Sequence, residues 1–419
     1  MKPLPGFRDL LPDDVARRNY ITSQWRALAG RFGFVEFDGP TLESAELYEK
    51  KNSGGEILTQ LYQFTDRGER PVALRPEMTP TLARIAGTHH RSFLKPLRWF
   101  SIGNCFRYER QQRGRLREFL QLNCDLLGER SSSADAEVIT LLIELLKSFG
   151  FGPNDFVIRL SDRLVWQHFL EQHEIPNEKM TELLNIIDKM ERESEETTKE
   201  KLAACSSQLS LGILQEFMNN PEGSALAPLL EELSIRGVRE YVQPDLSIVR
   251  GLAYYTGIVF EAFPLKGGLR AIAGGGRYDS LIHHLSDGAA NEPAVGFGMG
   301  DAVLLEFLKS VPQAALQERE YLSAHNPCQI YIVIADETYR REAVTFASEL
   351  RGAGWRVIFP LSPERVGKQF SAAETAQAAL AIVIGAEWPQ LKVKQLSTRE
   401  ESEMTREAFL IWLQSLSSL

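Results

Sequence analysis

Hydrophobic residues recur with two different spacings along the chain, and each spacing predicts a different element. Ile21, Trp25, Leu28 and Phe32 are three or four residues apart, which is typical of a buried helical face that ends at Gly33. Shorter apolar or alternating runs, bounded by turn residues, predict strands. These strands are expected near residues 34–37, 60–66, 72–74, 156–160 and 258–263.

Residues 97–128 predict two strands joined by a loop that is rich in arginine. Gly114 marks the turn. The arginines around it are Arg107, Arg110, Arg113, Arg115 and Arg117. Several guanidinium groups in one place suit a planar, multiply anionic ligand such as phosphate, whereas a solvated charged loop is the alternative. Alternation puts Gln121, Asn123 and Asp125 on one face of the return strand, where a polar row would make a ligand floor.

The middle and the end of the chain have different patterns. Residues 163–239 are almost wholly helical in pattern, so we expect a helical insertion at about 163–240 within a catalytic domain that spans residues 1–318. Its charged stretch 188–201 is interpreted as a solvated face, with contact to RNA as the weaker alternative. Residues 309–326 are interpreted as a linker. Alternating strand and helix patterns then predict an independent α/β domain at 327–419.

Composition is that of an ordinary globular protein and excludes several classes. A net charge of -9 gives no global basic field, so a polyanionic partner would need local patches. The 4 cysteines are scattered and form no CxxC pair, which suggests neither a zinc site nor a disulfide framework. No apolar run reaches the length of a membrane span or forms a signal core, so we expect a cytoplasmic protein without membrane association.

Several stretches together resemble the histidyl-tRNA synthetases, a family of class II aminoacyl-tRNA synthetases. FRYER, then RGRLREF and a strand that ends in an acid, resembles motif 2 of the class. PGFRDLLP is similar to the family's opening, and residues 32–40 are similar to motif 1. SIVRGLAYYTG at 247–257 resembles a signature peculiar to the family. AIAGGGRYD at 271–279 is similar to the glycine-rich strand end beside its amino-acid pocket, and 294–301 is similar to motif 3.

The resemblance implies an α+β fold and a two-step reaction. The catalytic domain would be an antiparallel sheet flanked by helices, and the C-terminal domain would bind the anticodon. Histidine would attack the α-phosphate of ATP, and the histidyl-adenylate would then acylate tRNA(His). A homodimer is implied. Mg²⁺ would bridge the phosphates with few protein ligands, so no dedicated metal site is expected.

Site residues follow from the matching motif positions. The histidine site would consist of Glu77, Thr79, Arg107, Gln121, Asp125, Arg250, Tyr254 and Tyr255. The ATP site would consist of Arg107, Glu109, Arg115, Phe119 and Arg250. Arg107 and Arg250 would stabilise charge on the α-phosphate, with Phe119 beneath the base. Tyr255 is expected at the imidazole, and Glu77, Gln121 and Asp125 at the ammonium group. Consecutive strand residues point to opposite faces, so only one of Tyr254 and Tyr255 is expected to face the pocket directly.

Two positions depart from the family and leave an alternative open. Val303 stands where motif 3 carries an arginine, and Ala253 stands where an acid is usual. Both departures favour a non-catalytic paralogue that binds histidine as a signal, such as the regulatory subunit of ATP phosphoribosyltransferase. Arg107, Arg250 and the C-terminal domain favour the synthetase. A generic RNA-binding protein would leave the pocket motifs unexplained.

Overall fold

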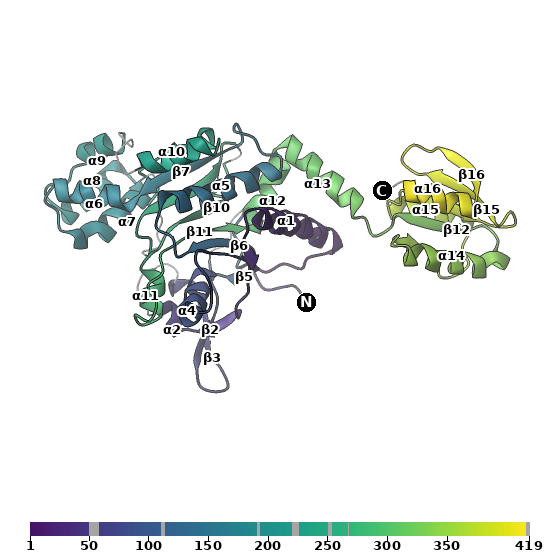
Figure 1. The fold of residues 1–419 in the computed structure, drawn as a ribbon, viewed down its shortest axis with the longest axis horizontal. Helices are drawn as coiled ribbons and strands as arrows, with labels where there is room; N and C mark the ends of the chain where they lie inside the picture. The colour runs from purple at the N-terminus through teal and green to yellow at the C-terminus, as the bar shows by residue number, and fades with distance from the viewer. Residues whose placement is uncertain are drawn as a thin grey trace. The chain divides into compact units, whose positions relative to one another are not determined.

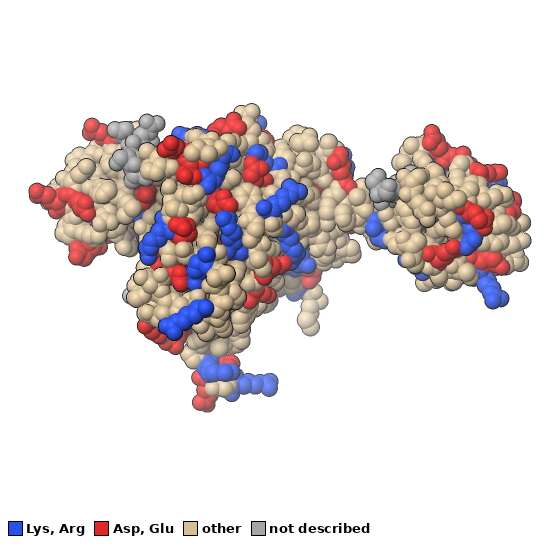
Figure 2. All heavy atoms as spheres, in the orientation of Figure 1, with Lys and Arg blue, Asp and Glu red and all other residues tan. Residues whose placement is uncertain are grey.

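A computed structural model describes residues 1–49, 58–109, 114–190, 193–219, 226–249, 254–266 and 268–415. The chain divides into two compact units, Met1–Glu318 and Arg319–Leu419 (Figure 1). Basic and acidic side chains are interspersed over the visible face of each unit (Figure 2). Within the described part of the chain, no helix combines the length and the apolar character that crossing a membrane requires.

An eight-stranded sheet forms the centre of the first unit, with the order β1-β5-β6-β11-β10-β9-β7-β8. The strands are β1 (Val35–Glu36), β5 (Leu97–Phe106), β6 (Glu118–Leu127), β11 (Ala294–Gly300), β10 (Ala273–Arg277), β9 (Ile258–Pro264), β7 (Phe156–Asp162) and β8 (Val242–Pro244). Only the outermost pairs, β1 with β5 and β7 with β8, are parallel. The antiparallel sheet that the resemblance implied is therefore confirmed.

Strands β5 and β6 form the expected hairpin, and β6 separates two environments. Their register pairs Cys105 with Phe119 and Ser101 with Asn123. Leu122, Cys124 and Leu126 are buried on one face of β6, which contacts the long helix α5 (Ser132–Ser148). Because side chains alternate along a strand, Asn123 and Asp125, which lie between these residues, point to the opposite face. The loop residues Arg110 and Arg113 lie outside the described residues.

Helices cover one face of this sheet, and a small sheet stands beside it. The covering helices are α1 (Pro12–Arg31), α5 and α12 (Asp301–Ser310), and α13 (Pro312–Ala324) follows α12 along the chain. The small sheet has the order β2-β4-β3, and its strands are β2 (Leu42–Ser44), β3 (Tyr62–Thr65) and β4 (Pro71–Leu74). The helices of this region are α2 (Glu46–Glu49), α4 (Thr79–His89) and α11 (Leu281–Leu285). Helix α13 corrects the interpretation of 309–326 as a linker. Its Ala, Leu, Glu, Gln and Arg residues have high helix propensity, and Pro312 suits a first helical position.

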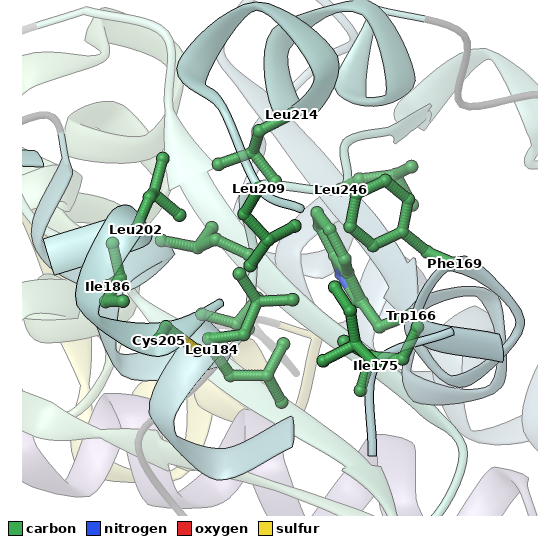
Figure 3. Close-up of a cluster of buried hydrophobic side chains, with 14 of the residues drawn as sticks. Trp166, Phe169, Ile175, Leu184, Ile186, Leu202, Cys205, Leu209, Leu214 and Leu246 are labelled. Atoms are coloured by element: carbon green, nitrogen blue, oxygen red, sulfur yellow. The ribbon is translucent and has the colours of Figure 1, made fainter. Parts of the chain in front are cut away.

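The insertion is helical, as expected, and has its own core. Its elements are α6 (Arg163–Gln172), η1 (Asn177–Lys179), α7 (Met180–Met190), α8 (Glu195–Cys205), α9 (Leu211–Met218), α10 (Ala227–Ile235) and η2 (Arg239–Tyr241). Trp166 and Phe169 of α6 pack with Leu184, Leu202 and Leu214 from the next three helices (Figure 3). Helix α10 instead contacts α5, so it belongs to the layer that covers the central sheet.

The second unit contains a five-stranded sheet with the order β13-β12-β14-β15-β16. Its elements are β12 (Ile330–Ile334), η3 (Glu337–Tyr339), α14 (Arg340–Gly352), β13 (Val357–Ile358), α15 (Val366–Thr375), β14 (Leu380–Ile384), β15 (Gln390–Gln395), β16 (Glu401–Thr405) and α16 (Arg406–Ser415). Strand β16 was not predicted. Its sequence ESEMT has no buried residue, so it carries no hydrophobic alternation.

Candidate functional site

A cavity of about 650 Å³ lies over the polar face of the central sheet. Ten of the residues predicted for the site line it: Glu77, Thr79, Arg107, Glu109, Arg115, Phe119, Gln121, Asp125, Tyr254 and Tyr255. Arg250 and Ala253 lie outside the described residues. The structure therefore brings together every predicted site residue that it describes, although these residues come from segments far apart in the sequence.

Glycines keep the floor of this cavity open. The residues Gly296 and Gly298 of β11 pair with Asp125 and Asn123 of β6. A Cβ atom at Gly298 would stand 2.9 Å from Nε2 of Gln121, and one at Gly296 would collide with the Asp125 carboxylate. A side chain at Gly296 or Gly298 would thus displace a polar side chain of β6.

A buried carboxyl group stands at one end of the floor. The hydroxyl of Tyr278 donates a hydrogen bond of 2.5 Å to Oδ1 of Asp125, and Asp125 is 1% exposed. Burial raises the pKa of Asp125 from 3.8 to about 7, against the hydrogen bond from Tyr278, which lowers it. The ring of Tyr255 lies against Gly276, which pairs with Gly296 beside Asp125. The ring of Tyr255 and the carboxylate of Asp125 therefore lie over two paired residues of β10 and β11.

A second carboxylate lies where β4 gives way to α4. Glu77 and Thr79 are both buried there. The hydroxyl of Tyr254 donates a 2.9 Å hydrogen bond to Oε2 of Glu77. Burial raises the pKa of Tyr254 well above its ordinary value, and the negative charge of Glu77 acts in the same direction. Tyr254 is thus the protonated donor of this pair.

Both consecutive tyrosines line the cavity, so the expectation that only one would face it is wrong. The alternation rule does not apply to them, because Tyr254 and Tyr255 precede β9 and are not strand residues. Their ring centroids are 4.8 Å apart.

Cations and an aromatic ring mark the opposite end of the floor. Nε of Arg107 donates a 2.9 Å hydrogen bond to the carbonyl oxygen of Pro76, and its guanidinium carbon lies 5.3 Å from the centroid of the Phe119 ring. Arg115 forms an ion pair with the buried carboxylate of Glu109. This end can receive an aromatic base and a polyanion, whereas the other end offers carboxylates and tyrosine hydroxyls.

The strand-to-helix joint of β11 and α12 closes this end. Val303, on the first turn of α12, lines the cavity. The buried carboxylate of Asp301 accepts a hydrogen bond of 3.0 Å from the backbone N–H of Leu120 and forms an ion pair with Arg8. The N-terminal PGFRDLLP stretch therefore fixes α12 against β6.

Four polar residues that also line the cavity were not assigned to the site from the sequence: Asn123, Glu261, Arg270 and Tyr278. Alternation had already put Asn123 on the correct face. Tyr278 lies within the glycine-rich stretch 271–279 that the resemblance identified. Glu261 pairs with Gly274 in the sheet, and nothing in the sequence shows that pairing.

Known proteins match this chain over nearly its whole length. A family model described as Histidyl-tRNA synthetase matches residues 6–301, and one described as Anticodon binding domain matches residues 329–416. A histidine--tRNA ligase of Opitutus terrae is 40% identical over 430 residues, which cover 96% of each chain. A chloroplastic/mitochondrial histidine--tRNA ligase of Arabidopsis thaliana is 38% identical over 96% of this chain and 85% of its own. The crystal structure of histidyl-tRNA synthetase from Nostoc covers 99% of both chains with a TM-score of 0.77 at 23% identity, which shows the shared fold. The chain belongs to the histidyl-tRNA synthetase family.

Proposed function

We propose that the chain joins histidine to tRNA(His) in two steps at this cavity. The carboxylate of histidine attacks the α-phosphorus of ATP and expels pyrophosphate. A terminal ribose hydroxyl of the tRNA then attacks the carbonyl carbon of the adenylate and releases AMP. One observation supports this most strongly: a single cavity is lined by carboxylates and tyrosines at one end and by arginines and Phe119 at the other.

Histidine binds at the end that carries carboxylates. Glu77 and Thr79 accept hydrogen bonds from the ammonium group, and Gln121 lies beside them on the floor. Asp125 was expected at the ammonium group as well. The Asp125 carboxylate and the ring of Tyr255, the candidate for the imidazole, lie over the paired residues Gly296 and Gly276, which favours the imidazole as the partner of Asp125 instead. A site that hydrogen-bonds both ring nitrogens discriminates strongly against apolar amino acids, because its buried polar groups would stay unpaired.

ATP binds at the opposite end, where charge is stabilised. Phe119 lies beneath the base, and Glu109 and Arg115 contact the nucleotide. Arg107, together with Arg250, stabilises the charge that develops on the α-phosphate, which this reaction needs more than it needs a proton acceptor. The two substrate halves then meet near Arg107.

Mg²⁺ fits this donor set. Hard carboxylate oxygen is the protein ligand that Mg²⁺ prefers, and it usually takes one or two carboxylates together with phosphates and water. Glu109 and Glu261 line the cavity and would hold it. When bound, the ion neutralises phosphate charge during displacement of pyrophosphate.

The partners follow from the family. The second unit binds the anticodon of tRNA(His), which the match to the anticodon-binding family supports. The protein acts as a homodimer in the cytoplasm. Catalytic domain 1–318, with its helical insertion, carries out the reaction. C-terminal domain 327–419 binds the anticodon.

The runner-up is the regulatory paralogue, which Val303 and Ala253 favour. The full-length matches to histidine--tRNA ligases and the presence of the second unit favour the synthetase over it. Histidine-dependent ATP–pyrophosphate exchange decides between them, with phenylalanine as the control amino acid. We expect exchange with histidine and background with phenylalanine. Tight histidine binding without any exchange would instead support the paralogue.

A further inference from the structure

Arg270 is a cation at the nucleotide end of the cavity to which neither the motifs nor the family comparison assigned a task. It precedes β10, its side chain is exposed, and it lines the same cavity as Phe119, Ala302 and Val303. Among the described residues, only Arg107, Arg115 and Arg270 bring positive charge to the cavity lining.

The sheet register brings Arg270 next to the first turn of α12. Strand β10 runs antiparallel to β11 and pairs Ala273 with Met299. One residue before the ladder, the N–H of Ile272 still donates a 2.8 Å hydrogen bond to the carbonyl of Ala262 on the other side. Because β10 begins at Ala273, opposite Met299, and α12 begins two residues after Met299, the segment that carries Arg270 leaves the sheet at the end where α12 starts. Arg270 and Val303 line the same cavity, so long side chains at the two positions would face one space.

A nucleoside triphosphate needs positive charge at this end of the cavity. Arg115 forms its ion pair with Glu109, and Arg107 is held against Pro76 and the Phe119 ring. A nucleoside triphosphate brings about four negative charges, and guanidinium groups bind phosphate oxygens through charge-assisted hydrogen bonds. We propose that Arg270 binds the phosphates of ATP and supplies, from the segment before β10, the cation that Val303 does not supply from α12. This inference rests on the proposed ATP-dependent function.

Substitution of Arg270 tests the proposal in the full-length protein. Arg270→Ala should raise the KM for ATP in histidine-dependent pyrophosphate exchange by roughly ten- to a hundredfold, the scale of a lost hydrogen bond to a charged group. The dissociation constant for histidine, measured by calorimetry without ATP, should change less than about twofold. Arg270→Lys keeps the charge and should lie between the parent and Arg270→Ala. Lys266→Ala removes an exposed cation from the same β9–β10 connection, outside the cavity lining, and should match the parent.

Relocating the cation is the sharper experiment. In a double variant, Arg270→Ala with Val303→Arg, the KM for ATP should recover at least severalfold relative to Arg270→Ala. The proposal is overturned if Arg270→Ala leaves the KM for ATP unchanged, if Arg270→Lys is as impaired as Arg270→Ala, or if a double variant that binds histidine normally recovers nothing. Absence of exchange in the parent protein would instead contradict the proposed function itself.

Discussion

At the scale of single residues, the cavity contains polar groups whose burial costs free energy unless they form hydrogen bonds with protein or ligand. Asp125 is a buried carboxyl group whose proton is retained to about pH 7, and Tyr278 donates to it. Such a group reduces the stability of the free protein at neutral pH, but it becomes useful once a ligand donates a second hydrogen bond to it.

Asp125→Asn should therefore change how stability depends on pH. The pKa of this carboxyl group is raised in the folded state from 3.8 to about 7, so the folded protein binds the proton more tightly than the unfolded chain. Its contribution to stability is present below about pH 4 and is lost as pH rises towards 7. Asn keeps an oxygen for Tyr278 and has no charge, so the variant should melt at a higher temperature than the parent at pH 8 but not at pH 4.

Thermal melting at both pH values measures this difference, and Asp188→Asn, a change at an exposed aspartate, is the matched control. An equal shift for Asp125→Asn at pH 4 and pH 8 would show that ionisation of Asp125 is not the cause.

Arg250→Ala tests the proposed centre of charge stabilisation. Loss of one preorganised donor to a developing charge typically costs roughly two orders of magnitude or more in rate. Single-turnover formation of the adenylate should slow by that factor, while the melting temperature should change little. An unchanged activation rate would exclude the role.

At the scale of elements, the glycines of β11 turn a sheet face into a cavity floor. Gly298→Ala would bring a methyl group to 2.9 Å from Nε2 of Gln121, so Gln121 must shift. Histidine affinity should fall by roughly tenfold, the scale of about one lost hydrogen bond.

Gly30→Ala in α1, where the new methyl group would have no heavy atom within 4 Å, is the control and should slightly stabilise the protein through helix propensity. Calorimetry and melting of both variants separate binding from stability, and normal histidine affinity in Gly298→Ala would refute this role of the glycine.

Much of the element order was readable from the sequence, because it depends on local spacing. The hairpin around Gly114, the helical insertion and most of the second unit follow from apolar periodicity. Strand β16 and helix α13 did not, since neither has a strong apolar face and both are held by contacts with neighbours. The site residues that were found came from motifs. Glu261 was not found because strand pairing, which motifs do not encode, brings it to the cavity, and Arg270 lies in the connection before β10, which carries no motif.

At the scale of the whole molecule, the boundary between the two units determines where the chain can be divided. A linker at 309–326 would place the cut near Val311. Helix α13 makes that cut unsuitable, because Ala314 and Glu318 are buried and Gln317 lies against Gly150 in the first unit. A cut after Ala324 keeps these contacts and removes the strands and helices that match the anticodon-binding family.

A chain that ends at Ala324 should separate the two steps of the reaction. Histidine-dependent ATP–pyrophosphate exchange should persist, because the described residues of the cavity all belong to the first unit. Aminoacylation should weaken through a higher KM for tRNA(His), because contacts to the anticodon are lost while the chemistry is retained. Size-exclusion chromatography checks that the oligomeric state matches the parent, and a chain cut at Val311 should melt at a lower temperature. Equal tRNA affinity with and without the second unit would show that tRNA recognition lies elsewhere in the protein.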